Sequence, residues 1–458
     1  MAQPSSEAGD TKPERSSSKT ATKDQGRFAP PRDVGRASRV RWRLFLLLLL
    51  LVTINYVDRG SISVAMPLIQ KDFTLTPAEI GLLSSAFFWT YALMQIPIGW
   101  VIDRYGPRKV IAGSAFGWGL ATAASGLAWG FGSLFWLRSV IGIAEAGIYP
   151  SGGKLNATWM TQTERGRGAT ILDGGAPLGS AIGGIAIVGL ILLTGSWRPA
   201  FIIAGLATVL VGFLAWWYIR NNPREHKSAN AAEIEHIELA HAEEERLALP
   251  EGATGPGKLR NFFRYRSFWA MCTGWLGFNG VFYGLLTWGP LYLFDARGFK
   301  LSDLGWSTFA IFGAGFVGEI IGGLIADYWR SRGGSANLVM RVLLGFAAVM
   351  VVAGLFGVIV TPNALTAVAL LSVVLFFLRW VGLFWSLPAT LGGPARAGIL
   401  GGAMNFSGNI SGFVTPIAVG LIVGATGGYT WALLYFVAAG VLMLASVLTI
   451  DYTKRLPI

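Results

Sequence analysis

The sequence predicts an all-α polytopic membrane protein, with twelve transmembrane helices in two pseudo-symmetric halves of six. Two features of the composition lead to this fold class: 53% of the 458 residues are hydrophobic and only 14% are charged. Soluble domains carry about 25% charged residues, so a water-soluble globule of this composition would expose too much apolar surface. The third feature is a series of apolar runs of about 20 residues, which is the length that an α-helix needs to cross a bilayer.

These apolar runs define twelve expected spans. They cover residues 44–66, 79–102, 109–129, 133–155, 168–193, 199–219, 267–293, 303–328, 338–360, 365–391, 397–424 and 429–450. The strands of a membrane β-barrel would be about ten residues long with alternating polarity, which does not match these runs. The first run begins near residue 44 and is long enough to remain as a span, so we do not interpret the N-terminus as a signal peptide.

The composition divides the chain into four expected parts. Residues 1–40 are rich in Ser, Lys, Arg and Pro, and we expect a disordered basic cytoplasmic tail. Residues 41–220 form the N-terminal six-helix half, 221–266 a cytoplasmic linker, and 267–458 the C-terminal six-helix half. Within the linker, Ala231–Arg246 is dense in Ala, Glu and His, which predicts a short surface helix.

The distribution of basic residues predicts the orientation in the membrane. Of the 37 Lys and Arg residues, 29 lie in segments on the same side as the N-terminus, and 4 lie in the loops on the other side. By the positive-inside rule, both termini are cytoplasmic. The same distribution accounts for the net charge of +12, so we expect contact with the lipid bilayer and no nucleic-acid partner.

A short motif recurs after the second and the eighth expected span. It comprises Gly99, Asp103, Arg104, Gly106 and Arg108 in the first copy, and Gly323 and Asp327 in the second. The glycine allows close helix approach, and the aspartate can pair with an arginine or a helix N-terminus. Duplicated halves that meet at a central site are typical of secondary transporters with alternating access.

Eight charged residues lie inside the expected spans, apart from those near the span ends. They are Asp58, Arg59, Arg138, Glu145, Lys154, Asp173, Glu319 and Arg379. Each costs about 2.5–3.5 kcal/mol to insert, so each should face a partner or a wet cavity. All three histidines lie in the linker, so any proton coupling in the membrane falls to the carboxylates.

Structural explanations for these charges remain open. Arg138 and Glu145 are seven residues apart, which places them on one face of span four. The pairs Arg138–Glu145 and Asp58–Arg59 could therefore be static ion pairs that brace the bundle. Glu319 and Arg379 are expected to pair between spans eight and ten. Asp173 is expected to cap its helix or meet a cytoplasmic arginine, and Lys154 to extend to the interface.

Several motifs carry a resemblance to a known family. Besides Gly99–Lys109, they are Asn55-Tyr56-Val57-Asp58-Arg59 in span one, Arg138-x3-Gly142-x2-Glu145 in span four, and Asn405-Phe406-x2-Asn409 in span eleven. With these motifs, the chain resembles the major facilitator superfamily over residues 40–455. Within it, the chain is similar to the anion:cation symporter family, close to bacterial sugar-acid:proton symporters for galactonate, glucarate and hexuronates.

The resemblance implies a function and a set of site residues. It implies proton-coupled symport of an organic anion, most simply a sugar acid, by a monomer in the bacterial inner membrane, without a metal or cofactor. Asp58 and Glu145, with Arg138, would carry proton coupling, and Arg59 would anchor the substrate carboxylate or act in coupling. Further substrate-binding residues would be Tyr56, Tyr91, Asn279, Trp385, Asn405 and Asn409. The repeated Gly–Asp motif would act as a cytoplasmic gate.

Some features leave the substrate and the transport direction open. Sugar-acid members often carry an amide in span five, where this chain has Ala176-Pro177, and span seven is strongly aromatic. An importer of an aromatic or other carboxylic acid, and an efflux antiporter on the same fold, therefore remain alternatives. The stretch Gly313–Gly318 matches GxGxxG but lies in an apolar helix with no preceding strand, so we expect helix packing there rather than a nucleotide site. Because the sequence offers no catalytic or cofactor motif, we expect no enzyme.

Overall fold

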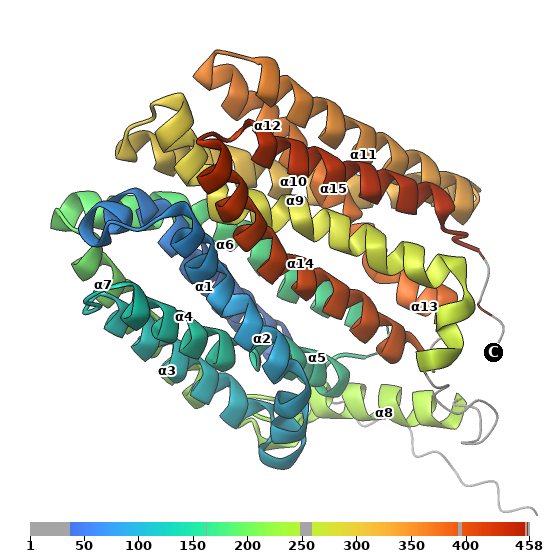
Figure 1. Cartoon of the computed structure of the whole chain (residues 1–458). Helices are drawn as coiled ribbons and strands as arrows, with labels where there is room; N and C mark the ends of the chain where they lie inside the picture. The colour runs from blue at the N-terminus through green and yellow to red at the C-terminus, as the bar shows by residue number, and fades with distance from the viewer. Residues whose placement is uncertain (1–36, 162, 248–258, 393–395, 454–455, 457–458) are drawn as a thin grey trace, which may run out of the picture.

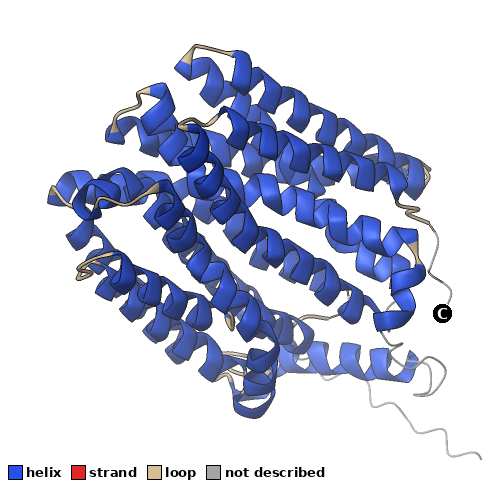
Figure 2. Ribbon diagram, in the orientation of Figure 1, coloured by secondary structure: helices blue, strands red, loops and turns tan. Residues whose placement is uncertain are grey.

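The computed structural model describes residues 37–161, 163–247, 259–392, 396–453 and 456. The described residues form helices and connecting turns, with no strand among them (Figure 2). The expected disordered tail lies outside these residues, apart from positions 37–40.

The helices follow the expected spans. The first part of the chain forms α1 (Val40–Phe73), α2 (Pro77–Tyr105), α3 (Pro107–Ser125), α4 (Phe131–Glu145), α5 (Ile148–Trp159), α6 (Arg165–Thr194) and α7 (Trp197–Tyr218). The linker forms η1 (Pro223–Glu225), α8 (Ala231–Leu247) and η2 (Leu259–Arg264). The second part forms α9 (Arg266–Arg297), α10 (Leu301–Ser331), α11 (Ala336–Val360), α12 (Ala364–Leu378), η3 (Arg379–Ser386), α13 (Leu387–Gly392), α14 (Ala397–Thr426) and α15 (Thr430–Thr449).

Each of the twelve expected spans falls on a helical segment of the described chain, in two cases an interrupted one: α4 with α5, and α12 with η3 and α13. By length and composition, nine described helical stretches can cross a membrane, and the bent helix α2 is a tenth. The remaining two expected spans, α3 and α9, are less apolar because glycine, tryptophan and polar residues lower their mean hydropathy.

Local sequence explains where α2 begins. Thr76 accepts a hydrogen bond from the backbone N–H of Glu79, and the Glu79 carboxylate accepts one from the Thr76 N–H at 2.8 Å. Pro77 occupies the first helical position, where no backbone donor is needed. This reciprocal cap satisfies two donors that a helix start leaves unpaired.

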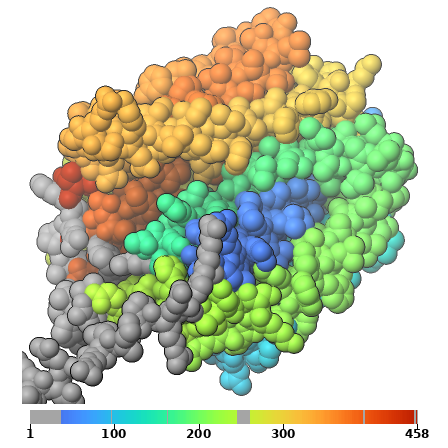
Figure 3. All heavy atoms as spheres, turned by 180° about the vertical axis from the view of Figure 1, so that it is seen from behind, coloured from blue at the N-terminus to red at the C-terminus, as the bar shows by residue number. Residues whose placement is uncertain are grey.

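The first seven helices and the last helices pack as two groups that meet along two seams. Within the first group, α1 packs on α6, α2 on α4, and α3 on α7. Between the groups, α6 packs on α10 and α2 on α14. Figure 1 shows α1, α2 and α14 near the middle of the molecule, and Figure 3 shows the gold α10 lying along the green α6 on the other face. The two groups thus enclose a central space between them.

Helices α2 and α14 of the two groups approach each other closely at one end of the bundle. We call the end where α8 lies the linker end, and the opposite end the far end (Figure 1). Toward the far end, a Cβ on Gly81 of α2 would lie 2.6 Å from the Pro416 oxygen of α14, and one on Gly420 would lie 2.5 Å from the Pro77 oxygen. Only glycine permits this approach. At the linker end of α2, no described atom lies within 4 Å of where a Cβ on Gly99 would stand.

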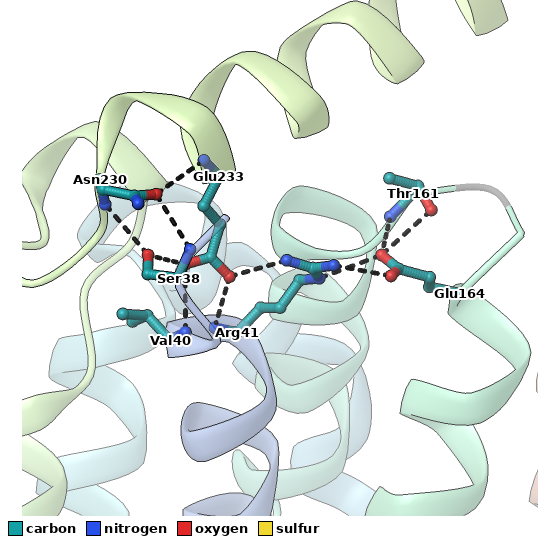
Figure 4. Close-up of polar contacts among 7 residues, drawn as sticks. All are labelled: Ser38, Val40, Arg41, Thr161, Glu164, Asn230 and Glu233. Carbon is teal, nitrogen blue, oxygen red and sulfur yellow. Dashed lines mark hydrogen bonds and ion pairs between the residues drawn. The ribbon is translucent and has the colours of Figure 1, made fainter. Parts of the chain in front are cut away.

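The linker helix α8 coincides with the predicted surface helix and is fastened to the first helices (Figure 4). Its Glu233 is fully buried and accepts hydrogen bonds from the backbone N–H of Val40 and Arg41, at 3.1 and 3.2 Å, and from Arg41 Nη1 at 2.9 Å. Arg41 also binds Glu164, which precedes α6. Burial opposes ionisation of Glu164, but the hydrogen bonds and charge of Arg41 outweigh it, so the pKa of this carboxyl lies below its usual range.

Large apolar side chains remain exposed on the outer helices. Leu193 of α6, Leu210 of α7 and Val360 of α11 are between 68 and 85% exposed. Soluble monomers rarely expose extended apolar surface, whereas lipid-facing helices must do so. The outer surface therefore fits a protein that crosses a bilayer several times.

Candidate functional site

A cavity of about 190 Å³ lies in the central space between the two groups of helices. All seven residues expected to bind substrate line it: Tyr56, Arg59, Tyr91, Asn279, Trp385, Asn405 and Asn409. They come from α1, α2, α9, η3 and α14, so both groups contribute. The cavity therefore brings together residues that the sequence places up to about 350 positions apart.

Arg59 is the best-defined cation in this cavity. Its Nε donates to Glu145 Oε2 at 3.0 Å, and both side chains are almost fully buried. Its guanidinium carbon lies 4.6–4.8 Å from the ring centres of Tyr56, Phe87 and Tyr91, at the distance of cation–π contacts. Arg59 Nη2 is buried and makes no hydrogen bond to a described residue. Glu145 thus uses only Nε of the guanidinium group, and the two N–H donors of Nη2 remain for an anion.

The ion pair differs from the two that the sequence suggested. Glu145 pairs with Arg59 rather than Arg138, and Arg59 pairs with Glu145 rather than Asp58. Arg138 is buried near Glu145, but its Nε makes no hydrogen bond to a described residue. Asn55 lies beside Glu145, whose Oε1 is likewise without a described hydrogen-bond partner. Shared helical spacing predicted that Arg138 and Glu145 face one way, but the partner comes from a neighbouring helix.

Asp58 lies apart from the cavity, inside the first group of helices. Trp118 Nε1 donates to its Oδ2 at 2.8 Å, and Thr208 Oγ1 donates to the same atom at 3.3 Å. Asp58 is 2% exposed and does not line the cavity, and neither do Arg138 and Glu145. The three expected coupling residues therefore form a layer behind the cavity wall, with Arg59 between Glu145 and the cavity.

A second cluster of charged residues, from α6, α10 and η3, reaches the cavity where α6 packs on α10. Arg379 of η3 donates from Nη2 to Glu319 Oε2 at 2.5 Å and from Nε to the same oxygen at 3.2 Å, so the predicted Glu319–Arg379 pair is confirmed. Asp173 of α6 lines the cavity, with its carboxyl facing Glu319 and near Arg379. The expectation that Asp173 caps its helix is therefore wrong. Helix α6 begins at Arg165, eight residues before Asp173, and Asp173 instead lies where α6 packs against α10.

Four amide side chains line the cavity, and one of them escaped the sequence reasoning. Asn279 and Asn409 each donate to a carbonyl of their own helix, at 2.8 and 3.1 Å, which leaves their oxygens as acceptors. Gln95 of α2 also lines the cavity, and its Nε2 is buried without a described partner. Gln95 supplies an amide that α6 lacks, since Ala176 of α6 lines the same cavity. A polar residue inside an apolar span was the available signal for Gln95.

The repeated Gly–Asp motif lies at the linker end. Asp103 pairs with Lys154 Nζ at 2.6 Å, both partly exposed, so Lys154 extends to the helix ends as expected. Gly106 has φ +82° and turns against Asn221, whose Oδ1 accepts the Arg108 N–H at 2.9 Å.

Other members of the motif make fewer contacts between helices. Arg108 also donates to the Trp216 carbonyl oxygen, at 3.0 and 3.1 Å. Arg104 lies over the rings of Trp100 and Tyr105 of its own helix, and Asp327 is exposed. The close helix approach expected at Gly99 is absent from the described contacts.

Comparison with known proteins identifies the family. The profile of the Major Facilitator Superfamily matches residues 48–416. The chain belongs to the Major Facilitator Superfamily. Among curated relatives, the probable sulfoacetate transporter SauU of Cupriavidus necator is 34% identical, over 90% of this chain and 96% of the relative. The probable galactarate/D-glucarate transporter GudP of Escherichia coli K12 is 30% identical (92% and 96%), and a D-galactonate transporter of Escherichia coli is 28% identical (93% and 99%).

A solved structure supports the same fold. A bacterial homologue of the human lysosomal transporter Spinster, in an inward-facing and occupied conformation, superposes with a TM-score of 0.71 at 20% identity, over 90% of this chain and 97% of that one. The resemblance to the Major Facilitator Superfamily and to bacterial sugar-acid transporters is thus confirmed. This protein is a multi-pass membrane transporter of that superfamily rather than an enzyme.

Proposed function

We propose that this transporter carries an organic anion of the sugar-acid type into the bacterial cell together with protons, by alternating access. Curated relatives are named as transporters of sulfoacetate, galactarate, glucarate and galactonate, which are all organic anions. The observation that carries the proposal is Arg59. It is a buried guanidinium group at the cavity wall, held by Glu145 through Nε, with its Nη2 left without a described partner.

The arrangement of Arg59 and Glu145 supports anion binding that is linked to a proton. A guanidinium group matches a carboxylate through two parallel donors, and it stays charged at any working pH. A substrate carboxylate and Glu145 compete for this one cation. Protonating Glu145 removes its charge and releases Arg59 to the substrate, so a proton and the anion enter together. Arg138 and Asp58, which lie behind this pair, complete the proposed coupling group.

The remaining polar residues of the cavity suit a hydroxylated acid. The amide groups of Gln95, Asn279, Asn405 and Asn409 provide donors and acceptors for hydroxyl groups. The rings of Tyr56 and Trp275 give flat apolar surface for a carbon chain. An aromatic or other carboxylic acid would use the rings more and the amides less, and it stays as the alternative substrate class.

The close approach of α2 and α14 at the far end, and the lack of a described contact at Gly99 near the linker end, support an inward-open state. The excess of basic residues in the N-terminal segment, the linker and the loops on the same side supports a cytoplasmic location for the linker end and both termini. In the opposite state, Gly99 and Asp103 would approach the second group of helices, which gives the repeated motif its role as a cytoplasmic gate. We propose that this cycle runs in a monomer, in the bacterial inner membrane.

Transport by the purified protein in liposomes tests this function. Counterflow with a panel of labelled acids should show exchange of sugar acids, and an inward proton gradient should drive accumulation. Accumulation that persists after the pH gradient and the membrane potential are both collapsed would contradict proton symport. Efflux antiport on the same fold would instead appear as uptake that is stimulated by an outward proton gradient.

A further inference from the structure

Two arginines, one from each group of helices, line the single cavity described above. Arg59 belongs to α1 and Arg379 to η3. Tyr56 lies within electrostatic range of both guanidinium groups and of Asp173. A site for one carboxylate needs only one of these cations, so the second has no role in the function proposed above.

The two arginines have the same kind of surroundings. Arg59 is held by Glu145 at 3.0 Å and lies against three aromatic rings. Arg379 is held by Glu319 at 2.5 Å, and its guanidinium carbon lies 5.4 Å from the ring centre of Phe282. Each side chain is at least nine-tenths buried. Each is thus a desolvated cation, positioned by one carboxylate and still open to the cavity.

Each arginine also keeps donors that its carboxylate does not use. Arg59 Nη2 has no described hydrogen-bond partner. The hydrogen bonds of Arg379 leave from Nε and Nη2 and end on the same oxygen of Glu319. The Glu319 pair does not use its Nη1. An unpaired buried donor such as Arg59 Nη2 is expensive, so it requires an acceptor that the described residues do not supply.

We propose that the transported anion carries two acidic groups, of which Arg59 binds one and Arg379 binds the other. This inference rests on the proposed function, because it assumes that the cavity holds the transported anion. It narrows the substrate class to dianions such as dicarboxylates or sulfocarboxylates. Arg379 then becomes the residue that distinguishes a dianion from a monoanion of the same chain length.

The charges around the cavity define the conditions for this binding. With every group ionised, Arg59 and Arg379 face three carboxylates: Glu145, Glu319 and Asp173. Asp58 and Arg138 behind the wall balance each other. A bare dianion would therefore enter a site with an excess of negative charge. Asp173 and Glu319 are close enough to repel each other when both are ionised. Protons at Glu145 and at one of these two carboxyls would remove this excess, so we expect the dianion to enter together with protons.

A substrate that bridges the arginines also links binding to closure. Arg379 is the first residue of η3, and the same segment brings Gly382 and Trp385 to the cavity wall. One acidic group on Arg59 and the other on Arg379 would draw the two groups of helices together at the linker end. A monoanion could hold only one side and would leave the other arginine with its carboxylate.

Competition between matched acids tests the inference. Glucarate and gluconate share a six-carbon hydroxylated chain, and they differ in whether the second terminus is a carboxylate or a hydroxymethyl group. On the full-length protein in liposomes, glucarate should inhibit exchange of a labelled sugar acid at a concentration lower by at least about tenfold, which corresponds to about 1.4 kcal/mol. Equal inhibition by both acids, or a preference for gluconate, would overturn the inference while leaving anion transport intact. Exchange of no organic anion would instead defeat the proposed function.

A double variant assigns the preference to Arg379. Arg379→Gln with Glu319→Gln removes the pair without leaving a lone buried charge, and it should bring the glucarate-to-gluconate ratio to within about threefold of unity, with gluconate exchange retained. The matched control is Arg224→Gln with Glu238→Gln, an exposed arginine–glutamate pair on the linker, which should keep the wild-type ratio. An unchanged ratio in the Arg379 variant, or an equal loss for both acids, would overturn the assignment. Should the double variant fold poorly, Arg379→Lys takes its place, with the same expected fall in ratio.

Discussion

Glu145→Gln separates proton coupling from simple bracing of the helix bundle. The substitution mimics the protonated side chain, since glutamine keeps the size of glutamate and an oxygen that can accept from Arg59 Nε. If Glu145 carries a proton, substrate exchange should persist because exchange needs no net proton movement. Accumulation driven by a gradient should be lost, because the empty carrier can no longer release a proton.

The structure gives the size of the effect on binding. Arg59 and Glu145 are 3.0 Å apart and almost fully buried, and Arg138 lies close by. Removing one partner of such a pair costs about 3–5 kcal/mol, because it leaves an uncompensated charge. A substrate carboxylate supplies the negative charge that Arg59 then lacks. Affinity for the substrate should therefore rise by at least about tenfold, which uses about 1.4 kcal/mol of that range.

The assay measures three quantities on one purified preparation of the variant in liposomes or nanodiscs. They are counterflow exchange, accumulation under an inward proton gradient, and the rise in melting temperature on adding substrate. Glu244→Gln is the control, because Glu244 pairs with Arg165 in a half-exposed site outside the cavity. Parallel loss of exchange and accumulation, with a lower melting temperature that substrate does not restore, would refute the coupling role and leave Glu145 as a brace.

Three further substitutions test other parts of the structure. Arg59→Lys should reduce transport by at least about tenfold at normal expression, because a point ammonium cannot replace a bidentate fork; near-normal uptake would remove Arg59 from the anchor role. Glu233→Gln should release α8, with faster hydrogen exchange over 231–247 and a loss of about 1.5–3 kcal/mol, because the hydrogen bonds from Val40 and Arg41 lose their charged acceptor. Glu238→Gln, on the exposed side of α8, should leave hydrogen exchange and stability unchanged, and equal hydrogen exchange in both variants would refute the fastening role. Gly81→Val should force α2 and α14 apart at the far end and abolish transport, as measured by labelling of single cysteines introduced at the far end. Gly113→Ala should have no effect, because no atom lies within 4 Å of the added Cβ. Unchanged labelling in the Gly81 variant would argue against a close approach of α2 and α14.

Much of this protein is determined by its sequence alone. The low charge and the apolar runs of about 20 residues dictate transmembrane helices, because backbone polar groups in lipid must be satisfied within each segment. Local signals also fix where helices begin, as Thr76 and Glu79 do for α2. The Gly99–Lys109 motif indicated the superfamily, and short motifs in spans one, four and eleven indicated the family within it. They also selected residues that the fold brings to one cavity, such as Arg59 and Asn409.

The pairing of charges was decided only by the tertiary structure. Spacing along a helix predicts which side chains share a face, as it did for Arg138 and Glu145. It cannot predict which neighbouring helix supplies the partner, and here Arg59 of α1 does. Asp173 looked like a helix cap because it is near the start of its span, yet the packing of α6 on α10 places it beside Glu319. In a low-dielectric interior, the partner within about 3 Å sets a charge's role, and that distance depends on how helices distant in sequence pack together.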